Sequence, residues 1–242
     1  MLIAIEGIDG TGKGSVTENL VSAISACSTY KAKYISFPRY TETAYGRIVG
    51  RYLNGDFGDS SEHPLMHGTL FALDRFESKS YLHKLMQSFD FVICDRYVPS
   101  NLCYSAMIAP PEEAENVVKH FMDLEYGLFK MPKPDAIFVL DMSISTAISN
   151  IAKKGQRQYT DRSADIFEAD EEYLQKVKSF YTEELQNLHP DVYFKTIECE
   201  KEEKLLAIPV IVQAILDVLF KLKEVYDGKE TAFFKATKQR VC

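Results

Sequence analysis

The chain has 242 residues, of which 46% are hydrophobic and 26% are charged. This composition is typical of a soluble folded protein with a sizeable core, and it excludes a disordered or fibrous chain. The formal net charge is −7, so the chain lacks the general positive field of a protein that coats nucleic acid. A local cluster of cations that binds a small anion is still compatible with this charge.

Membrane and disulfide signals are absent from the sequence. No stretch of about 18 apolar residues occurs, and the short apolar run after Met1 has no basic start of the kind a signal peptide carries. The five cysteines are widely spaced and form no CxxC pair or metal-ligand pattern. Reduced thiols in a cytoplasmic protein are the favoured interpretation, with no membrane and no nucleic acid among the partners.

Short apolar runs alternate with segments of helical spacing along the chain. The expected strands are residues 2–5, 33–37, 89–94, 136–140 and 192–197. The expected helices are roughly residues 15–26, 45–53, 65–86, 98–108, 112–128, 143–152, 166–187 and 201–223. This alternation predicts an α/β fold of three layers, a doubly wound sheet of about five parallel strands with helices on both faces. We expect one domain over residues 1–222, a polar loop at about 152–164, and a basic tail over 223–242.

Residues 7–13, GIDGTGK, follow the first predicted strand and match the GxxxxGK pattern of a phosphate-binding loop. Its glycines let backbone N–H groups converge on a phosphate, and Lys13 adds a full charge. The hydroxyl residue that usually follows the lysine and binds Mg²⁺ is replaced by Gly14, so we expect carboxylates to carry more of the metal coordination. The predicted ATP-binding residues are Gly7, Ile8, Asp9, Gly10, Thr11, Gly12, Lys13, Gly14 and Ser15.

The end of the third predicted strand narrows the class of phosphate-loop protein. An Asn-Lys-x-Asp motif that reads guanine is absent, which argues against a GTPase. The strand ends in Asp95-Arg96, whereas a hydrolytic ATPase usually carries a second acid there to activate water. A cation at this place suits a second phosphate, so the pattern favours phosphoryl transfer to an acceptor that is already phosphorylated.

Four blocks of sequence, in order, point to one family. They are residues 5–13, residues 37–40 (FPRY), residues 70–75 (LFALDR) and residues 95–105 (DRYVPSNLCYS), with a weaker fifth at 165–168 (DIFE). With these blocks, roughly residues 2–185 resemble the thymidylate kinases, P-loop nucleoside monophosphate kinases that move the terminal phosphate of ATP onto dTMP. The tail beyond about residue 222 has no counterpart in the family.

The resemblance assigns roles to individual positions. It implies that Arg96 grips the dTMP phosphate, that Phe71 stacks on thymine, and that Arg75 reads a thymine edge. The implied dTMP-binding residues are Asp9, Phe37, Arg39, Tyr40, Phe71, Arg75, Arg96, Asn101, Tyr104 and Asp165. The metal ligands expected from the resemblance and from the Gly14 substitution are Asp9, Asp95, Ser15 and Glu168.

The polar loop at 152–164 matches the lid of the family. One branch of the family carries a catalytic arginine inside the phosphate loop, and the other supplies the catalytic cation from the lid. Gly10 and Thr11 stand in the loop here, so the lid branch fits, with Lys153, Lys154, Arg157 and Arg162 as its cations. The cation would neutralise charge on the transferring phosphoryl group. The predicted catalytic residues are Lys13, Asp9, Arg96, Arg157 and Arg162.

The sequence therefore predicts a thymidylate kinase that makes dTDP and ADP for dTTP synthesis, with Mg²⁺ as cofactor and ATP as co-substrate. The resemblance also implies a homodimer. Two alternatives stay open at this point. One is a kinase for another deoxynucleoside monophosphate or for a nucleoside. The other is a catalytically weak nucleotide-binding protein, which Gly14 and the unmatched tail would favour.

Overall fold

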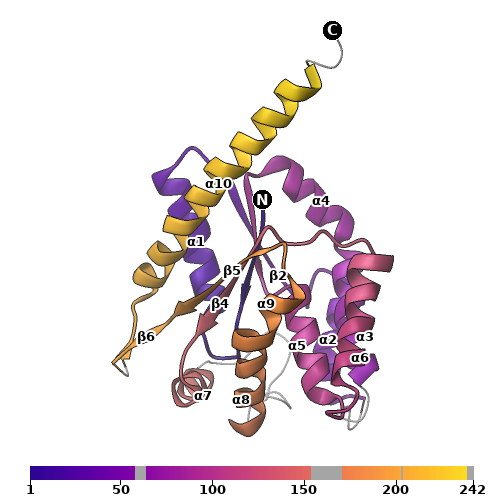
Figure 1. Cartoon of the computed structure of the whole chain (residues 1–242). Helices are drawn as coiled ribbons and strands as arrows, with labels where there is room; N and C mark the ends of the chain where they lie inside the picture. The colour runs from indigo at the N-terminus through magenta and orange to yellow at the C-terminus, as the bar shows by residue number, and fades with distance from the viewer. Residues whose placement is uncertain (58–63, 154–170, 203, 239–242) are drawn as a thin grey trace.

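The computed structural model describes residues 1–57, 64–153, 171–202 and 204–238 (Figure 1). A five-stranded sheet forms its centre. The strands are β1 (Leu2–Glu6), β2 (Ala32–Ser36), β3 (Phe91–Asp95), β4 (Ala136–Asp141) and β5 (Tyr193–Glu198). All neighbouring pairs are parallel, in the order β2-β3-β1-β4-β5. The predicted parallel sheet of about five strands is confirmed.

Helices cover both faces of this sheet, as predicted (Figure 1). On one face α1 (Lys13–Cys27) packs against the long helix α10 (Ile208–Lys238). On the other lie α5 (Val98–Ile108), α8 (Glu171–Ser179) and the π-helical segment η2 (Phe180–Glu184). The remaining helical segments are α2 (Ala44–Leu53), α3 (Pro64–Glu77), α4 (Lys79–Ser88), α6 (Ala114–Met122), the π-helical η1 (Asp123–Leu128), α7 (Ile144–Lys153) and α9 (Leu185–Leu188).

Two predicted helices differ in their bounds from the observed ones, and two others, 112–128 and 166–187, include the π-helical segments η1 and η2. The helix expected over 65–86 is two helices, α3 and α4, which meet at Ser78. The helix expected over 201–223 begins at Ile208, after a short antiparallel pair of strands, β6 (Glu200–Lys201) and β7 (Lys204–Leu205). Helix α10 then continues to Lys238, so the predicted domain boundary at residue 222 lies inside a helix.

The order of the strands decides where a ligand can bind. Strands β2 and β3 lie on one side of β1, and β4 and β5 lie on the other. Ligands of such sheets bind at the carboxyl ends of the strands where the strand order reverses. Glu6 ends β1 and Asp95 ends β3, so both side chains stand at this edge. None of the helices in the described part of the chain has both the length and the apolar character needed to cross a bilayer.

Candidate active site

The phosphate loop joins β1 to α1 and has the backbone that its glycines predict. Gly10 has a φ of 84°, and a Cβ atom there would lie 2.2 Å from the carbonyl oxygen of Ala147, so only glycine fits. The Lys13 Nζ atom donates hydrogen bonds to the carbonyl oxygens of Gly7 at 3.0 Å and Ile8 at 2.7 Å. The charge of Lys13 therefore lies over the loop, where the phosphates of a nucleotide bind in such motifs.

Arg96 follows β3 in an unusual backbone conformation. Its φ is 64°, in the left-handed region that costs a residue with a side chain about 1–2 kcal/mol. Two hydrogen bonds to β1 hold this turn: the Arg96 N–H donates to Ile5 O at 3.1 Å, and the Tyr97 N–H donates to Glu6 Oε1 at 2.8 Å. The turn keeps the guanidinium of Arg96 at the carboxyl edge of the sheet.

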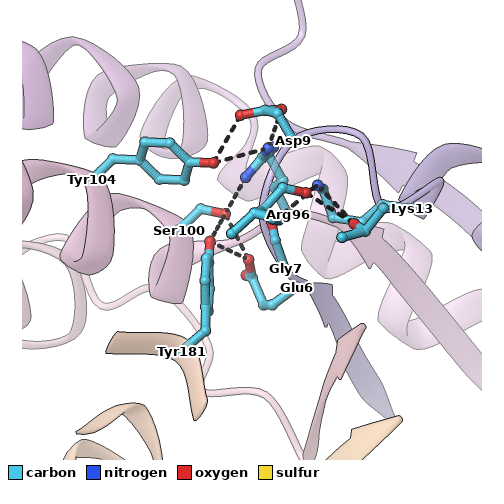
Figure 2. Close-up of polar contacts among 10 residues, drawn as sticks. Glu6, Gly7, Asp9, Lys13, Arg96, Ser100, Tyr104 and Tyr181 are labelled. Atoms are coloured by element: carbon cyan, nitrogen blue, oxygen red, sulfur yellow. Dashed lines mark hydrogen bonds and ion pairs between the residues drawn. The ribbon is translucent and has the colours of Figure 1, made fainter. Parts of the chain in front are cut away.

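Glu6 is the centre of a buried polar network, drawn in Figure 2. Its carboxylate is fully buried and accepts hydrogen bonds from Ser100 Oγ at 2.6 Å and Tyr181 OH at 3.2 Å. Burial raises the pKa of Glu6, and the Ser100 hydrogen bond and the charge of Arg96 partly oppose this rise. The Arg96 Nη1 atom donates to Ser100 Oγ at 3.1 Å. The network thus links β1, α5 and η2 to the position of Arg96.

Asp9 forms the second support of Arg96. Its Oδ1 atom lies 2.6 Å from Arg96 Nη2, and its Oδ2 atom accepts a hydrogen bond from Tyr104 OH at 2.8 Å. Burial pushes the pKa of Asp9 upward, but the charges of Arg96 and Lys13 and the Tyr104 hydrogen bond outweigh it, so the pKa lies below the ordinary 3.8. Asp9 is therefore ionised at neutral pH beside two cations (Figure 2).

A cleft begins at this cluster and runs toward α2 and α3. Eight of its lining residues are predicted dTMP-binding residues: Asp9, Phe37, Tyr40, Phe71, Arg75, Arg96, Asn101 and Tyr104. The cleft is also lined by three residues outside this prediction, Leu53, His67 and Ser100. Ser100 lies within the DRYVPSNLCYS block, so its place in that block was the available signal for it.

One end of the cleft suits a planar ring. The rings of Phe71 and His67 lie 4.6 Å apart between centroids, tilted by 34°. Burial and the nearby charge of Arg75 lower the pKa of His67 to about 3, so this imidazole is neutral at physiological pH. Arg75 and Asn101, both almost fully buried, add polar atoms to the same end. Stacking area with a few fixed polar groups is the usual composition of a site for a small ligand.

Several predicted residues are not brought into this cleft. The guanidinium of Arg39 donates to Ser78 Oγ at 3.1 Å and lies over the ring of Tyr81, away from the lining residues. A role for Arg39 beside the acceptor therefore stays a prediction. Asp165, Glu168, Lys154, Arg157 and Arg162 lie outside the described residues.

A second cavity lies on the other side of the phosphate loop. It is lined by residues of the loop and α1, of α7, and of the segment that leads into α10: Gly10, Thr11, Gly12, Ser15, Val16, Met142, Asn150, Lys153, Leu205, Leu206, Ile208 and Ile211. Asn150 Nδ2 donates to the carbonyl oxygen of Gly10 at 3.0 Å, which joins α7 to the loop. Lys153 is the one predicted lid cation that the described residues include, and it lines this cavity.

Gly14 stands close to a carboxylate. A Cβ atom at position 14 would lie 3.3 Å from Asp95 Oδ2. The carboxylate of Asp95 thus lies near position 14, where other phosphate loops carry the hydroxyl residue that binds Mg²⁺. Ser15 is exposed and lines the second cavity.

The chain resembles known proteins in sequence and in fold. The thymidylate kinase family model matches residues 5–205. A thymidylate kinase of Mycobacterium tuberculosis is 35% identical over 183 residues, which cover 76% of this chain and 85% of that protein. The Caenorhabditis elegans thymidylate kinase is 29% identical over 207 residues, covering 83% of each chain. The solved thymidylate kinase of Candida albicans shares the fold, with a TM-score of 0.66, 22% identity and 92% of each chain covered. The chain belongs to the thymidylate kinase family.

Proposed function

We propose that the protein transfers the γ-phosphate of ATP to dTMP, giving dTDP and ADP for dTTP synthesis. One observation carries this proposal. A single cleft has Asp9 and Arg96 beside the phosphate loop and the ring of Phe71 with Arg75 and Asn101 at its other end. A nucleoside monophosphate has the same order of parts, a phosphate joined through a sugar to a flat base.

Phosphoryl transfer asks the protein mainly to hold two nucleotides in line and to neutralise charge. The planar fork of Arg96 matches one face of the acceptor phosphate. Lys13 and the N–H groups of the loop suit the terminal phosphates of ATP. By resemblance, Arg157 or Arg162 of the lid would neutralise charge on the transferred group.

The second cavity is the proposed ATP site, since it borders the loop on the side away from the acceptor cleft. Leu205, Leu206 and Ile208 give it an apolar wall. Such a wall suits the faces of an adenine ring. Lys153, which lines the same cavity, would lie beside the bound nucleotide.

Mg²⁺ is the proposed cofactor. Among the described residues Asp9 and Asp95 offer carboxylate oxygens at the carboxyl edge of the sheet, and oxygen ligands are those that Mg²⁺ prefers. The nearness of Asp95 Oδ2 to position 14 supports a carboxylate in place of the missing hydroxyl. Ser15 and Glu168 remain candidate ligands by resemblance. The bound ion would screen phosphate charge during transfer.

A coupled assay of ADP release tests the proposal, with dTMP, dUMP, dCMP, dGMP and thymidine as acceptors in the presence of Mg²⁺. We expect the highest kcat/KM with dTMP. Turnover with none of the five by folded protein would overturn the function. Binding of ATP and dTMP in calorimetry without turnover would favour the nucleotide-binding alternative, and preference for another acceptor would favour a different nucleotide kinase.

Two further properties belong to the same proposal. The resemblance supports a homodimer, which sedimentation at equilibrium would detect as twice the mass of one chain. Cys27, Cys94, Cys103 and Cys199 are free thiols, which supports a reducing compartment such as the cytoplasm.

A further inference from the structure

Glu125 is a fully buried acid with no place in the reaction described so far. It lies in the π-helical segment η1, and π-helical turns often occur at functional sites. Its carboxylate does not line the acceptor cleft. It contacts two residues that do, Arg75 and Asn101, and any effect on a ligand must therefore pass through them.

The first partner is Arg75. The Nε atom of Arg75 donates to Glu125 Oε2 at 2.6 Å, and Nη2 donates to Glu125 Oε1 at 2.7 Å. Two parallel hydrogen bonds fix the plane of a guanidinium. Within the described part of the chain, no protein acceptor meets the Nη1 donors of Arg75. Held in this plane, Arg75 can only donate hydrogen bonds to a ligand in the cleft.

The second partner is Asn101. The carboxylate of Glu125 determines the orientation of its side-chain amide. Asn101 Nδ2 donates to Glu125 Oε1 at 2.8 Å and to the carbonyl oxygen of Gly68 at 3.0 Å. Both partners are acceptors, so both amide protons are used. The Oδ1 atom accepts one hydrogen bond, from Ser105 Oγ at 3.2 Å, and keeps a second lone pair. Asn101 therefore offers the cleft an acceptor.

We propose that Glu125 is the positioning residue that sets the hydrogen-bond order of the cleft, a donor at Arg75 next to an acceptor at Asn101, and thereby selects thymine over cytosine. Thymine and uracil present an acceptor, O4, beside a donor, N3–H. Cytosine presents the reverse order, an amino donor beside the N3 acceptor. The donors of Arg75 would then face the amino donor, and the Asn101 acceptor would face the N3 acceptor. A mismatch of this kind is strongly rejected by a preorganised site.

Glu125→Gln tests this role, which rests on the proposed function. The glutamine amide has the shape of the carboxylate, but its NH₂ group can donate to Asn101 Oδ1 and lets the Asn101 amide turn over. We expect the ratio of kcat/KM for dTMP to that for dCMP to fall by roughly tenfold or more, mostly through a higher KM for dTMP. Asp123→Asn, an isosteric change at an exposed acid of the same segment, should leave the ratio unchanged.

A purely structural role for Glu125 would give a different result. Loss of folded protein lowers both kcat/KM values together and leaves their ratio as in wild type. If Glu125→Gln does not fold, Glu125→Asp carries the test, because its shorter carboxylate cannot reach both partners and should also lower the ratio. An unchanged ratio in a folded variant would overturn the role of Glu125. Wild-type protein that phosphorylates neither nucleotide would instead overturn the proposed function.

Discussion

Arg96→Ala separates recognition of the acceptor phosphate from recognition of the nucleoside. The Arg96 side chain is 17% exposed, paired with Asp9 and held by Ser100, so its guanidinium is preorganised beside the phosphate loop. A charge-assisted hydrogen bond to such a group contributes about 1.5–3 kcal/mol. Two such bonds to one face of the phosphate, less the cost of weakening the Asp9 ion pair, contribute about 3–4 kcal/mol to the free energy of dTMP binding. This contribution corresponds to about 100- to 1000-fold in Kd.

Calorimetry with dTMP and thymidine measures this difference directly, because thymidine lacks the phosphate. We expect Arg96→Ala to weaken dTMP binding by that factor and thymidine binding by less than about tenfold. Arg51→Ala is the matched control, since Arg51 is an exposed arginine whose ion pair lies on the surface. Equal losses for the two ligands in Arg96→Ala would refute the assignment of the phosphate to Arg96.

Three further predictions concern the groups around Arg96. Glu6→Gln removes the buried carboxylate that holds the turn at Arg96, so the free energy of unfolding should fall by about 2–4 kcal/mol in urea denaturation, and an unchanged value would contradict this role. Asp9 has a lowered pKa, so its stabilising contribution is present above about pH 4 and is lost as the pH falls. The stability difference between wild type and Asp9→Asn should thus be constant above about pH 5 and shrink as the pH falls below about 4, and a difference that stays constant down to about pH 2 would count against the ion pair. Asp95→Asn should raise the Mg²⁺ concentration for half-maximal rate about tenfold or more, and Gly14→Ser added to it should restore part of the loss. An unchanged Mg²⁺ requirement in Asp95→Asn would remove Asp95 from the metal site.

The central strands and the phosphate loop were accessible from the sequence because local pattern and tertiary environment agree there. Strands β1, β3 and β4 are buried on both faces, so each reads as an uninterrupted apolar run. The glycines of the loop are required by backbone geometry, as the contact of position 10 with Ala147 shows. A position that only glycine can occupy is recognisable in the sequence as part of the GxxxxGK motif.

The helix boundaries that were wrong have identifiable causes. Residues 69–86 keep a helical spacing through Ser78 and contain no glycine or proline, so the change of direction between α3 and α4 has no local signal (Figure 1). The start of α10, in contrast, does have a local sequence signal. Pro209 is tolerated in the first turn of a helix but not in its interior, which argues against a helix that begins at 201.

The residues that support the site were harder to predict than those that line it. Glu6 and Glu125 are each an acid among apolar neighbours in sequence, and such a residue can equally lie at the surface. Their partners are distant in the chain: Glu6 meets Ser100 and Tyr181, and Glu125 meets Arg75. Contacts across such separations depend on the order of strands and helices, which single-sequence patterns do not contain.

A crystal structure with dTMP bound tests the central claim most directly, the claim that one cleft holds the acceptor nucleotide between Arg96 and the Phe71 end. We predict that the 5′-phosphate contacts the guanidinium of Arg96 and that thymine stacks on Phe71, with O4 at Arg75 and N3–H at Asn101. A nucleotide bound in the opposite direction, or outside this cleft, would contradict the account.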